Sequence, residues 1–361
     1  MKKWQLMMSI VGDLDLDIYQ NERYFQNRLI KNAFVIHPME CNDANNDGTP
    51  SEYTHDRYKK FVKGGAGIVW FETIAVSEQG RTNVKQLMIN SENIIEFKKL
   101  LCEVNKENKV ICIAQLSHGG RYSISDEIYE LYENLQMLDK QKEMYISSAK
   151  LAIEAGFDGI DLKFCHGFLM GDVLFNLGKY SYFNSYTERV NYIVNIISET
   201  KKRVGKGFIF AARIDISEFW SGEVLGFNEL IYLINSLRKT GVFLYSFSIK
   251  EYYIKNENLG LDDFRRKYSE LFHISQSVKK YFKDILIVSP GLTMYGPYIQ
   301  ETGKELLTIF DLIGFGRQAL AYPDFVNDIL NHKGLDKNRC CIMCGKCSDL
   351  RRKGQRVKCL K

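Results

Sequence analysis

Short apolar runs alternate along the chain with longer segments of mixed polarity. The runs are rich in β-branched and aromatic residues, and most are too continuously apolar for strands with one face in water. They recur at a spacing of about forty residues, which suits a parallel sheet covered by helices. The eight predicted strands are Ala33–His37, Gly67–Glu72, Val110–Leu116, Gly159–Lys163, Gly207–Arg213, Val242–Phe247, Ile285–Ser289 and Phe310–Gly316.

The segments between these runs carry apolar residues at helical spacing. Eight strands that alternate with helices predict an α/β fold of the (β/α)8 TIM barrel type. A doubly wound sheet also alternates in this way, but no Gly-x-Gly-x-x-Gly follows the first strand, which disfavours that fold. The clearest predicted helices are Glu92–Asn105, Leu138–Ala155, Arg189–Val204, Phe227–Thr240 and Asp262–Phe282.

Composition and charge narrow the cellular setting. With 361 residues, 45% of them apolar, the chain can bury a large core, and no apolar run reaches the length of a membrane span. Met1–Gly12 faintly resembles a signal peptide, but three aspartates follow directly and no small-residue cleavage site is present. We therefore expect a cytoplasmic protein with no membrane partner.

Nine cysteines in a chain without a secretory signal indicate metal binding rather than disulfides. Cys341, Cys344 and Cys347 are closely spaced, and Cys359 follows after eleven residues. Four thiolates in this pattern bind one iron–sulfur cluster or one zinc ion, and the spacing alone leaves both open. Cys340 is an alternative to Cys341 as a ligand. We expect a barrel over residues 1–335 and a cysteine-rich segment over 336–361 packed on it.

The cysteine segment is also basic. Residues 335–361 hold nine lysines and arginines against two aspartates, within a chain of net charge +5. Such a segment could meet nucleic acid, but it more simply offsets the negative charge of a thiolate-ligated cluster. We therefore expect no nucleic-acid partner.

Polar residues collect directly after the predicted strands, where barrel enzymes place their active sites. Gly291 and Gly316-Arg317 follow the last two strands and predict a phosphate cradle, although glycines there also simply turn the chain. Gln115 and Arg213 can complement the polar edge of a flavin pyrimidine ring. Arg213 could equally form a structural ion pair with Asp215 or Glu218.

Several further short motifs follow one another from about residue 27 to the end of the chain. They are Asn27-Arg28-Leu29 with Pro38-Met39, Gly64-Gly65-Ala66-Gly67 with Glu72 and Gly80-Arg81, Gln115-Leu116-Ser117-His118-Gly119-Gly120-Arg121, Ala155-Gly156-Phe157-Asp158-Gly159, His166-Gly167-Phe168-Leu169, Arg213 and Gly316-Arg317. Taken together, these motifs resemble the Old Yellow Enzyme family of flavin oxidoreductases. The cysteine run is similar to the iron–sulfur branch that includes 2,4-dienoyl-CoA reductase and trimethylamine dehydrogenase.

The resemblance implies FMN over the barrel mouth and NAD(P)H as electron donor. A flavin nearby favours a [4Fe–4S] cluster over zinc at the cysteines. The implied flavin-lining residues are Pro38, Met39, Glu40 and Thr73, with Gln115 and Arg213 at the pyrimidine and Gly291, Gly316 and Arg317 at the phosphate. The implied cluster ligands are Cys341, Cys344, Cys347 and Cys359.

The substrate pocket departs from the family pattern. The pair that grips a substrate carbonyl reads Lys163 and His166, where relatives carry His with His or Asn. A lysine there can instead be ion-paired, with Asp161 or Asp172 as partner. Phe168 stands where relatives commonly carry a proton-donating tyrosine. Either a tyrosine on a neighbouring loop donates the proton, with Tyr122, Tyr252 and Tyr253 as candidates, or the reaction does not need that step.

The leading functional hypothesis is an oxidoreductase that moves a hydride between flavin N5 and an enone or enoyl-thioester-like substrate. The chain ends two residues after Cys359, so we expect electrons to arrive from NAD(P)H over the flavin or to pass through the cluster to an electron-transfer protein. Amine-dehydrogenase-like oxidation is one alternative, and a non-catalytic barrel whose zinc site acts as a binding module is another. The oligomeric state, including a homo-oligomer, stays open.

Overall fold

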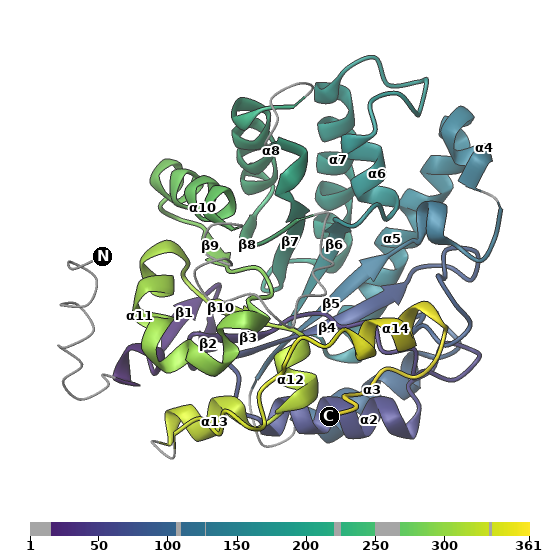
Figure 1. The fold of residues 1–361 in the computed structure, drawn as a ribbon. Coiled ribbons are helices and arrows are strands. Elements are labelled where there is room, and N and C mark those ends of the chain that lie inside the picture. Colours follow the sequence, from purple (N-terminus) through teal and green to yellow (C-terminus); the bar gives the residue numbers. More distant parts are fainter. Residues whose placement is uncertain (1–15, 106–109, 127, 220–224, 250–267, 332–333) are drawn as a thin grey trace.

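Eight parallel strands form the central sheet of the computed structural model (Figure 1), which describes residues 16–105, 110–126, 128–219, 225–249, 268–331 and 334–361. Their order is β10-β3-β4-β5-β6-β7-β8-β9. The Ser289 amide donates to the Leu312 carbonyl at 2.9 Å, which joins the two edge strands and closes the barrel. The strands are β3 (Phe34–Ile36), β4 (Ile68–Ala75), β5 (Ile111–Ser117), β6 (Gly159–Phe164), β7 (Ile209–Asp215), β8 (Val242–Ser248), β9 (Leu286–Val288) and β10 (Ile313–Phe315).

All eight predicted strands are present, and the predicted TIM-barrel fold is confirmed. Strand β4 shows why the runs are continuously apolar. Ile68 and Trp70 belong to a buried cluster inside the barrel, whereas Val69 and Phe71 belong to the larger cluster between barrel and helices. Successive side chains point to opposite faces of a strand, and here both faces are dry.

Helices surround this barrel (Figure 1). The predicted helix over residues 262–282 is described only from residue 268 onward. The principal helices are α2 (Glu52–Lys63), α3 (Ile94–Asn105), α5 (Leu135–Ala155), α7 (Tyr186–Val204), α8 (Phe227–Lys239), α10 (Ser269–Tyr281) and α11 (Ile299–Ile309), and the shorter ones are α4 (Ile128–Glu133), α6 (Leu169–Phe175), α12 (Arg317–Ala321), α13 (Phe325–Leu330) and α14 (Lys346–Arg352).

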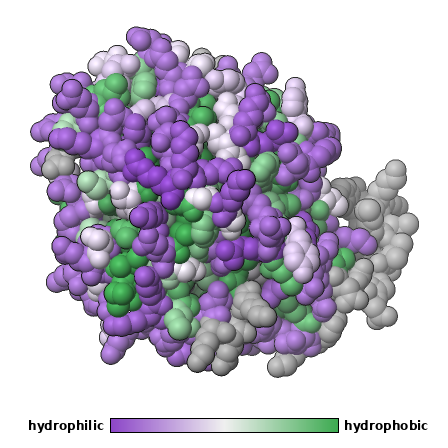
Figure 2. Space-filling model, turned by 180° about the vertical axis from the view of Figure 1, so that it is seen from behind, coloured by the Kyte–Doolittle hydropathy of each residue, from purple (hydrophilic) through white to green (hydrophobic). Residues whose placement is uncertain are grey.

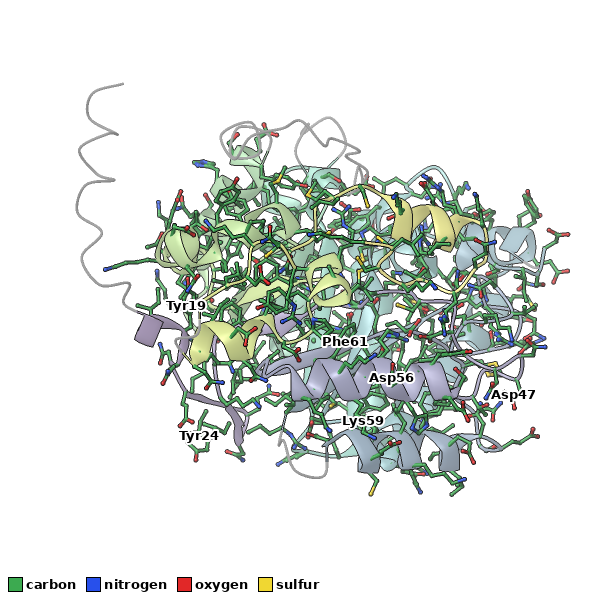
Figure 3. All side chains as sticks on the ribbon, turned by 60° about the horizontal axis from the view of Figure 1, so that its bottom comes forward. Tyr19, Tyr24, Asp47, Asp56, Lys59 and Phe61 are labelled. Atoms are coloured by element: carbon green, nitrogen blue, oxygen red, sulfur yellow. The ribbon has the colours of Figure 1, made fainter. Side chains whose placement is uncertain are left out.

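Local sequence sets where helix α2 begins. The Ser51 side chain accepts from the backbone N–H of Tyr53 and Thr54, and the Thr54 hydroxyl accepts from the Ser51 backbone N–H, which completes a capping box. Figure 3 shows Phe61 on the side of α2 that faces the barrel, while Lys59 lies toward α3, where it pairs with Glu103 at 2.8 Å.

A short antiparallel hairpin, β1 (Arg23–Phe25) and β2 (Arg28–Ile30), was not predicted. Its Ile30 joins the cluster inside the barrel, and Phe25 packs against that cluster. Ile68 and Ile111, the first residues of β4 and β5, belong to the same cluster. The hairpin therefore covers the end of the barrel opposite the carboxyl ends of the strands. Strands of three residues are too short to show a period, which is why the sequence does not reveal them.

The C-terminal segment packs on the barrel beside the end of β3. The Val357 amide donates to the Cys41 carbonyl at 2.8 Å, and Asn42 Nδ2 donates to the Arg351 carbonyl at 3.1 Å. In Figure 1 this yellow segment, with α14, runs across the front of the barrel. These contacts place the cysteine segment at the carboxyl ends of the strands.

The face of the molecule seen in Figure 2 is mainly polar. On this face, hydrophobic side chains lie between polar ones. In the described part of the chain, no helix combines the length and apolarity needed to cross a membrane.

His37 gives the first prediction, because it is buried at the seam where the barrel closes. Its Nε2–H donates to the Ser289 carbonyl at 2.7 Å. Burial, together with the Arg213 guanidinium, lowers the pKa of His37 to about 3. Between pH 6.5 and about 3 the unfolded chain therefore binds a proton there that the folded protein does not. Stability should fall on acidification in that window, with this residue contributing up to about 1.4 kcal/mol per pH unit.

We expect His37→Gln to flatten that dependence in denaturant titrations at pH 7, 6, 5 and 4. His273→Gln, at an exposed position of α10, is the matched control. An acid dependence that is identical in His37→Gln and wild type would contradict this assignment.

Candidate active site

A cavity of about 720 Å³ opens at the carboxyl ends of the strands. Thr73, Gly291 and Gly316 are not among its lining residues, and Tyr252 and Tyr253 lie outside the described residues. The candidate residues that the structure brings together around this cavity are Pro38, Met39, Glu40, Gln115, Tyr122, Lys163, His166, Arg213 and Arg317.

A buried carboxylate organises the floor of the cavity. Asp161 of β6 accepts from Gln115 Nε2 at 2.5 Å, from Trp70 Nε1 at 3.2 Å and from the Arg213 backbone N–H at 3.0 Å. Burial raises the pKa of Asp161 to about 6, although these hydrogen bonds and the nearby cations oppose the shift. The Gln115 amide nitrogen is thus held toward Asp161, and its carbonyl oxygen remains as an acceptor at the cavity.

Arg213 presents a buried positive charge to the cavity. Only 4% of its surface is exposed, and in the described part of the chain its Nε has no hydrogen-bond partner. The alternative prediction, an ion pair with Asp215 or Glu218, is not found in that part. A buried guanidinium without a carboxylate partner fits an anionic or carbonyl group of a ligand.

Lys163 lies deep in the same cavity. Its Nζ is 2.8 Å from Glu40 Oε1 and 3.2 Å from the centroid of the Phe168 ring. Its ion-pair partner is therefore Glu40, rather than Asp161 or Asp172. Burial lowers the pKa of Lys163, while the Glu40 carboxylate opposes that shift and favours the ammonium form.

Glu40 links the barrel to the cysteine segment. Besides Lys163, its carboxylate accepts from Thr73 Oγ1 at 3.1 Å and from Arg351 Nη1 of α14 at 3.0 Å. Burial alone would raise the pKa of Glu40, but Lys163 and Arg351 outweigh that effect and lower it to about 2. Glu40 is therefore ionised at neutral pH.

His166 and Tyr122 line the cavity around Phe168. The His166 backbone has a left-handed φ of 60°, and burial, with help from Arg213 and Lys163, lowers the pKa of His166 well below its usual value. Its imidazole is therefore neutral at pH 7. The Tyr122 ring is half exposed and lies 6.1 Å from the Phe168 ring, centroid to centroid.

The predicted phosphate residues are divided between two environments. Arg317 lines the cavity, but a Cβ at Gly316 would lie 2.8 Å from Met39 Sδ. A side chain at position 316 would therefore require Met39 to move. A phosphate role for Gly291 and Gly316 stays a prediction.

The cysteines surround a second, much smaller cavity of about 20 Å³, which Arg317 also lines. No three cysteine, histidine or acidic side chains of the described residues form a group that could hold one metal ion. Cys340 is buried, accepts from Gln318 Nε2 at 3.3 Å and does not line this cavity. The lining cysteines are Cys341, Cys344, Cys347 and Cys359.

A family model described as "NADH:flavin oxidoreductase / NADH oxidase family" matches residues 24–336. The chain belongs to this family. Its members are redox enzymes that use a flavin and a nicotinamide nucleotide, which supports both as cofactors here. The family assignment also agrees with the resemblance seen in the sequence.

The chain is similar to several known members of the family. It is 23% identical to an NADH oxidase of Thermoanaerobacter brockii over 83% of this chain and 48% of that protein, so it spans about half the length of that relative. It is 26% identical to an NADPH dehydrogenase of Bacillus cytotoxicus over 86% of this chain and 91% of that protein. The structure of an old yellow enzyme homologue from Zymomonas mobilis superposes with a TM-score of 0.68 at 16% identity, covering 88% and 93% of the two chains. This likeness confirms the fold.

Sequence reasoning missed two important contributors to the site, Asp161 and Arg351. Asp161 sits inside a strand, so only its burial reveals its role as an acceptor for three donors. Arg351 belongs to a run of basic residues in which nothing distinguishes it from Arg352 or Lys353.

Asp161→Asn tests the organising role of the Asp161 carboxylate. The substitution replaces a carboxylate that accepts three hydrogen bonds with a neutral amide. The NH2 group of the new asparagine would then face the N–H groups that donate to Asp161. We expect it to lower the free energy of unfolding by about 1–3 kcal/mol. Denaturant unfolding checks this, with Asp56→Asn on the exposed side of α2 as control. Equal stabilities for the two variants would exclude an organising role for Asp161.

Proposed function

We propose that the chain is an FMN-dependent oxidoreductase that exchanges a hydride between flavin N5 and an enone or enoyl-thioester-like substrate, with NAD(P)H as electron donor. The single observation that carries the proposal is the gathering of Gln115, Lys163, His166, Arg213 and Arg317 around one cavity at the carboxyl ends of a TIM barrel. FMN, when bound, would accept and deliver the hydride. The other requirements of the reaction fall on the residues of this chain.

The cavity fits the proposed flavin in its polar groups. The buried Arg213 guanidinium would stabilise negative charge at the pyrimidine edge, and the Gln115 carbonyl would accept a ring N–H. Arg317 would face the phosphate. Pro38 and Met39, which follow β3, add apolar lining beside these groups.

Lys163 and His166 would hold the substrate carbonyl as donors. The ammonium is the stronger, because hydrogen bonds from charged donors contribute about 1.5–3 kcal/mol against about 1 for neutral ones. The neutral imidazole of His166 can donate one N–H without adding a second charge. Tyr122 is the proposed proton donor to the substrate carbon, since its ring lies next to Phe168 at the cavity.

The charge of the cavity disfavours the amine-oxidising alternative. Six basic residues and a single acidic one, Glu40, line it, and Lys163 and Arg351 already neutralise that carboxylate. A cationic amine would therefore meet like charge. A carbonyl that becomes enolate-like in the transition state would be stabilised instead.

We further propose a [4Fe–4S] cluster on Cys341, Cys344, Cys347 and Cys359. The four side chains share one cavity, and a cubane binds one thiolate at each of its four iron atoms. The same four thiolates would also bind zinc, and the neighbouring flavin site is what favours the cluster. Arg317 and Cys347 line both this cavity and the large one, so electrons would have a short path between them. As the alternative to NAD(P)H, a partner protein in the cytoplasm would exchange electrons with the flavin through the cluster.

Lys163→Met tests the substrate site. Loss of the charged donor should lower kcat/KM for an enone by about 10- to 100-fold, and His166→Ala should lower it by less. Stopped-flow or steady-state assays measure this, with Lys201→Met on α7 as the exposed control. Thermal melting identifies any variant that misfolds. Wild-type kcat/KM in a folded Lys163→Met protein would refute the carbonyl-binding role.

Cys347→Ser tests the cluster. Anaerobically purified wild-type protein should contain about four iron atoms per chain, and the serine variant should retain less than half of that iron. Cys102→Ser, at an exposed position of α3, should keep the full content. Stoichiometric zinc without iron in the wild type would favour the zinc alternative, and full iron content in Cys347→Ser would remove this cysteine from the ligand set.

A further inference from the structure

The segment that carries the cysteines also reaches the substrate site. Arg351 lies in α14, four residues after Cys347, and it lines the large cavity together with Glu40 and Lys163. Its Nη1 donates to Glu40 Oε2 at 3.0 Å. The other carboxylate oxygen, Oε1, accepts from Lys163 at 2.8 Å. One carboxylate therefore joins a residue of the cysteine segment to a residue on the barrel floor.

This junction is strongly directional. Glu40 follows β3, and both of its oxygens are occupied: Oε1 accepts from Lys163 and Thr73, and Oε2 accepts from Arg351. Glu40 is 15% exposed and Lys163 4%, so water competes weakly for the Glu40–Lys163 contact, whereas the Arg351 side chain reaches Glu40 from the solvent side and is 46% exposed. Fixing both oxygens of Glu40 fixes the direction in which the Lys163 ammonium points.

The position of the Lys163 ammonium depends on its contact with Glu40. Its Nζ sits 3.2 Å from the centroid of the Phe168 ring, a close cation–π contact. A lysine side chain has four rotatable bonds and little intrinsic preference for one direction. Without a fixed carboxylate, the ammonium would retain only the ring face as a partner of defined geometry among the described contacts.

We propose that Arg351 is a positioning residue, which sets Lys163 through Glu40 and so makes the cysteine segment part of the substrate site. The inference rests on the proposed function in one respect, the role of Lys163 as ligand of the substrate carbonyl. It implies that a displacement of the cysteine segment also displaces the Lys163 ammonium in the substrate pocket.

The reactivity of Lys163 tests this directly and needs no turnover. Acetylation of Lys163 by acetic anhydride is followed by mass spectrometry from pH 6 to 10 in the purified protein. Glu40→Gln removes the carboxylate, so the ammonium form loses its partner and the amine should react about threefold to tenfold faster near neutral pH, as for a fall of half to one pKa unit. Arg351→Gln should also accelerate the reaction, because Glu40 is released from its fixed orientation.

The double variant and the control make the test specific. If Arg351 acts through Glu40, Arg351→Gln should add nothing to the effect of Glu40→Gln. Arg356→Gln is the matched control, since Arg356 is in the same segment but stacks on Tyr53. A purely electrostatic role predicts the opposite sign for Arg351→Gln, because removal of a cation beside Glu40 strengthens its hold on Lys163 and slows acetylation.

Slower or unchanged acetylation in Arg351→Gln, or effects of the two substitutions that add, would overturn the proposal. The KM of Arg351→Gln for the enone separates the positioning role of Arg351 from the proposed function. Faster acetylation with a KM for the enone raised severalfold supports both. Faster acetylation with unchanged KM supports the positioning role and refutes the role of Lys163 in substrate binding.

Discussion

Two carboxylates, the buried Asp161 and the largely buried Glu40, hold charged and polar groups at the mouth of the barrel. Burying charge is costly unless it is paired and hydrogen-bonded. Asp161 accepts from three donors on the floor, and Glu40 accepts from three donors between the floor and the cysteine segment. The orientation of the Gln115 and Lys163 side chains follows from these two acceptors, and Asp161 also fixes the Arg213 backbone.

The two carboxylates play different parts because their surroundings differ. Hydrogen bonds from neutral groups predominate around Asp161, so burial prevails and its pKa rises to about 6. Glu40 meets two full cations, which prevail over burial and lower its pKa to about 2. Asp161, on the floor of the cavity, thus has a pKa close to neutral pH, while Glu40 stays negatively charged. Among the other cations that line the cavity, Arg121 pairs with Asp172 and Arg352 with Asp349, whereas Arg213 forms no ion pair with a carboxylate of the described residues.

The barrel was predictable from the sequence because its strands are dry on both faces, as β4 shows with Trp70 inside and Phe71 outside. The location of the site was also predictable, because polar residues follow the strands and a parallel barrel gathers the carboxyl ends of all its strands at one rim. Pairings across the fold were not visible. Lys163 and Glu40 are 123 residues apart, and Arg351 and Glu40 are 311 apart, so only the closed barrel and the returning C-terminal segment bring them together. Nor does the sequence show that Cys341 lines the small cavity and Cys340 does not. Gln318 contacts both residues, because its Nε2 donates to Cys340 Sγ and its Oε1 accepts from the Cys341 backbone N–H.

The central claim is that the cavity at the barrel mouth is a flavin site, and identification of the bound chromophore tests it most directly. Protein purified without oxygen, denatured and analysed by chromatography with mass spectrometry should release about one FMN per chain. Apoprotein should then take up added FMN with quenching of the flavin fluorescence. Folded protein that releases no flavin and does not bind added FMN would contradict the account.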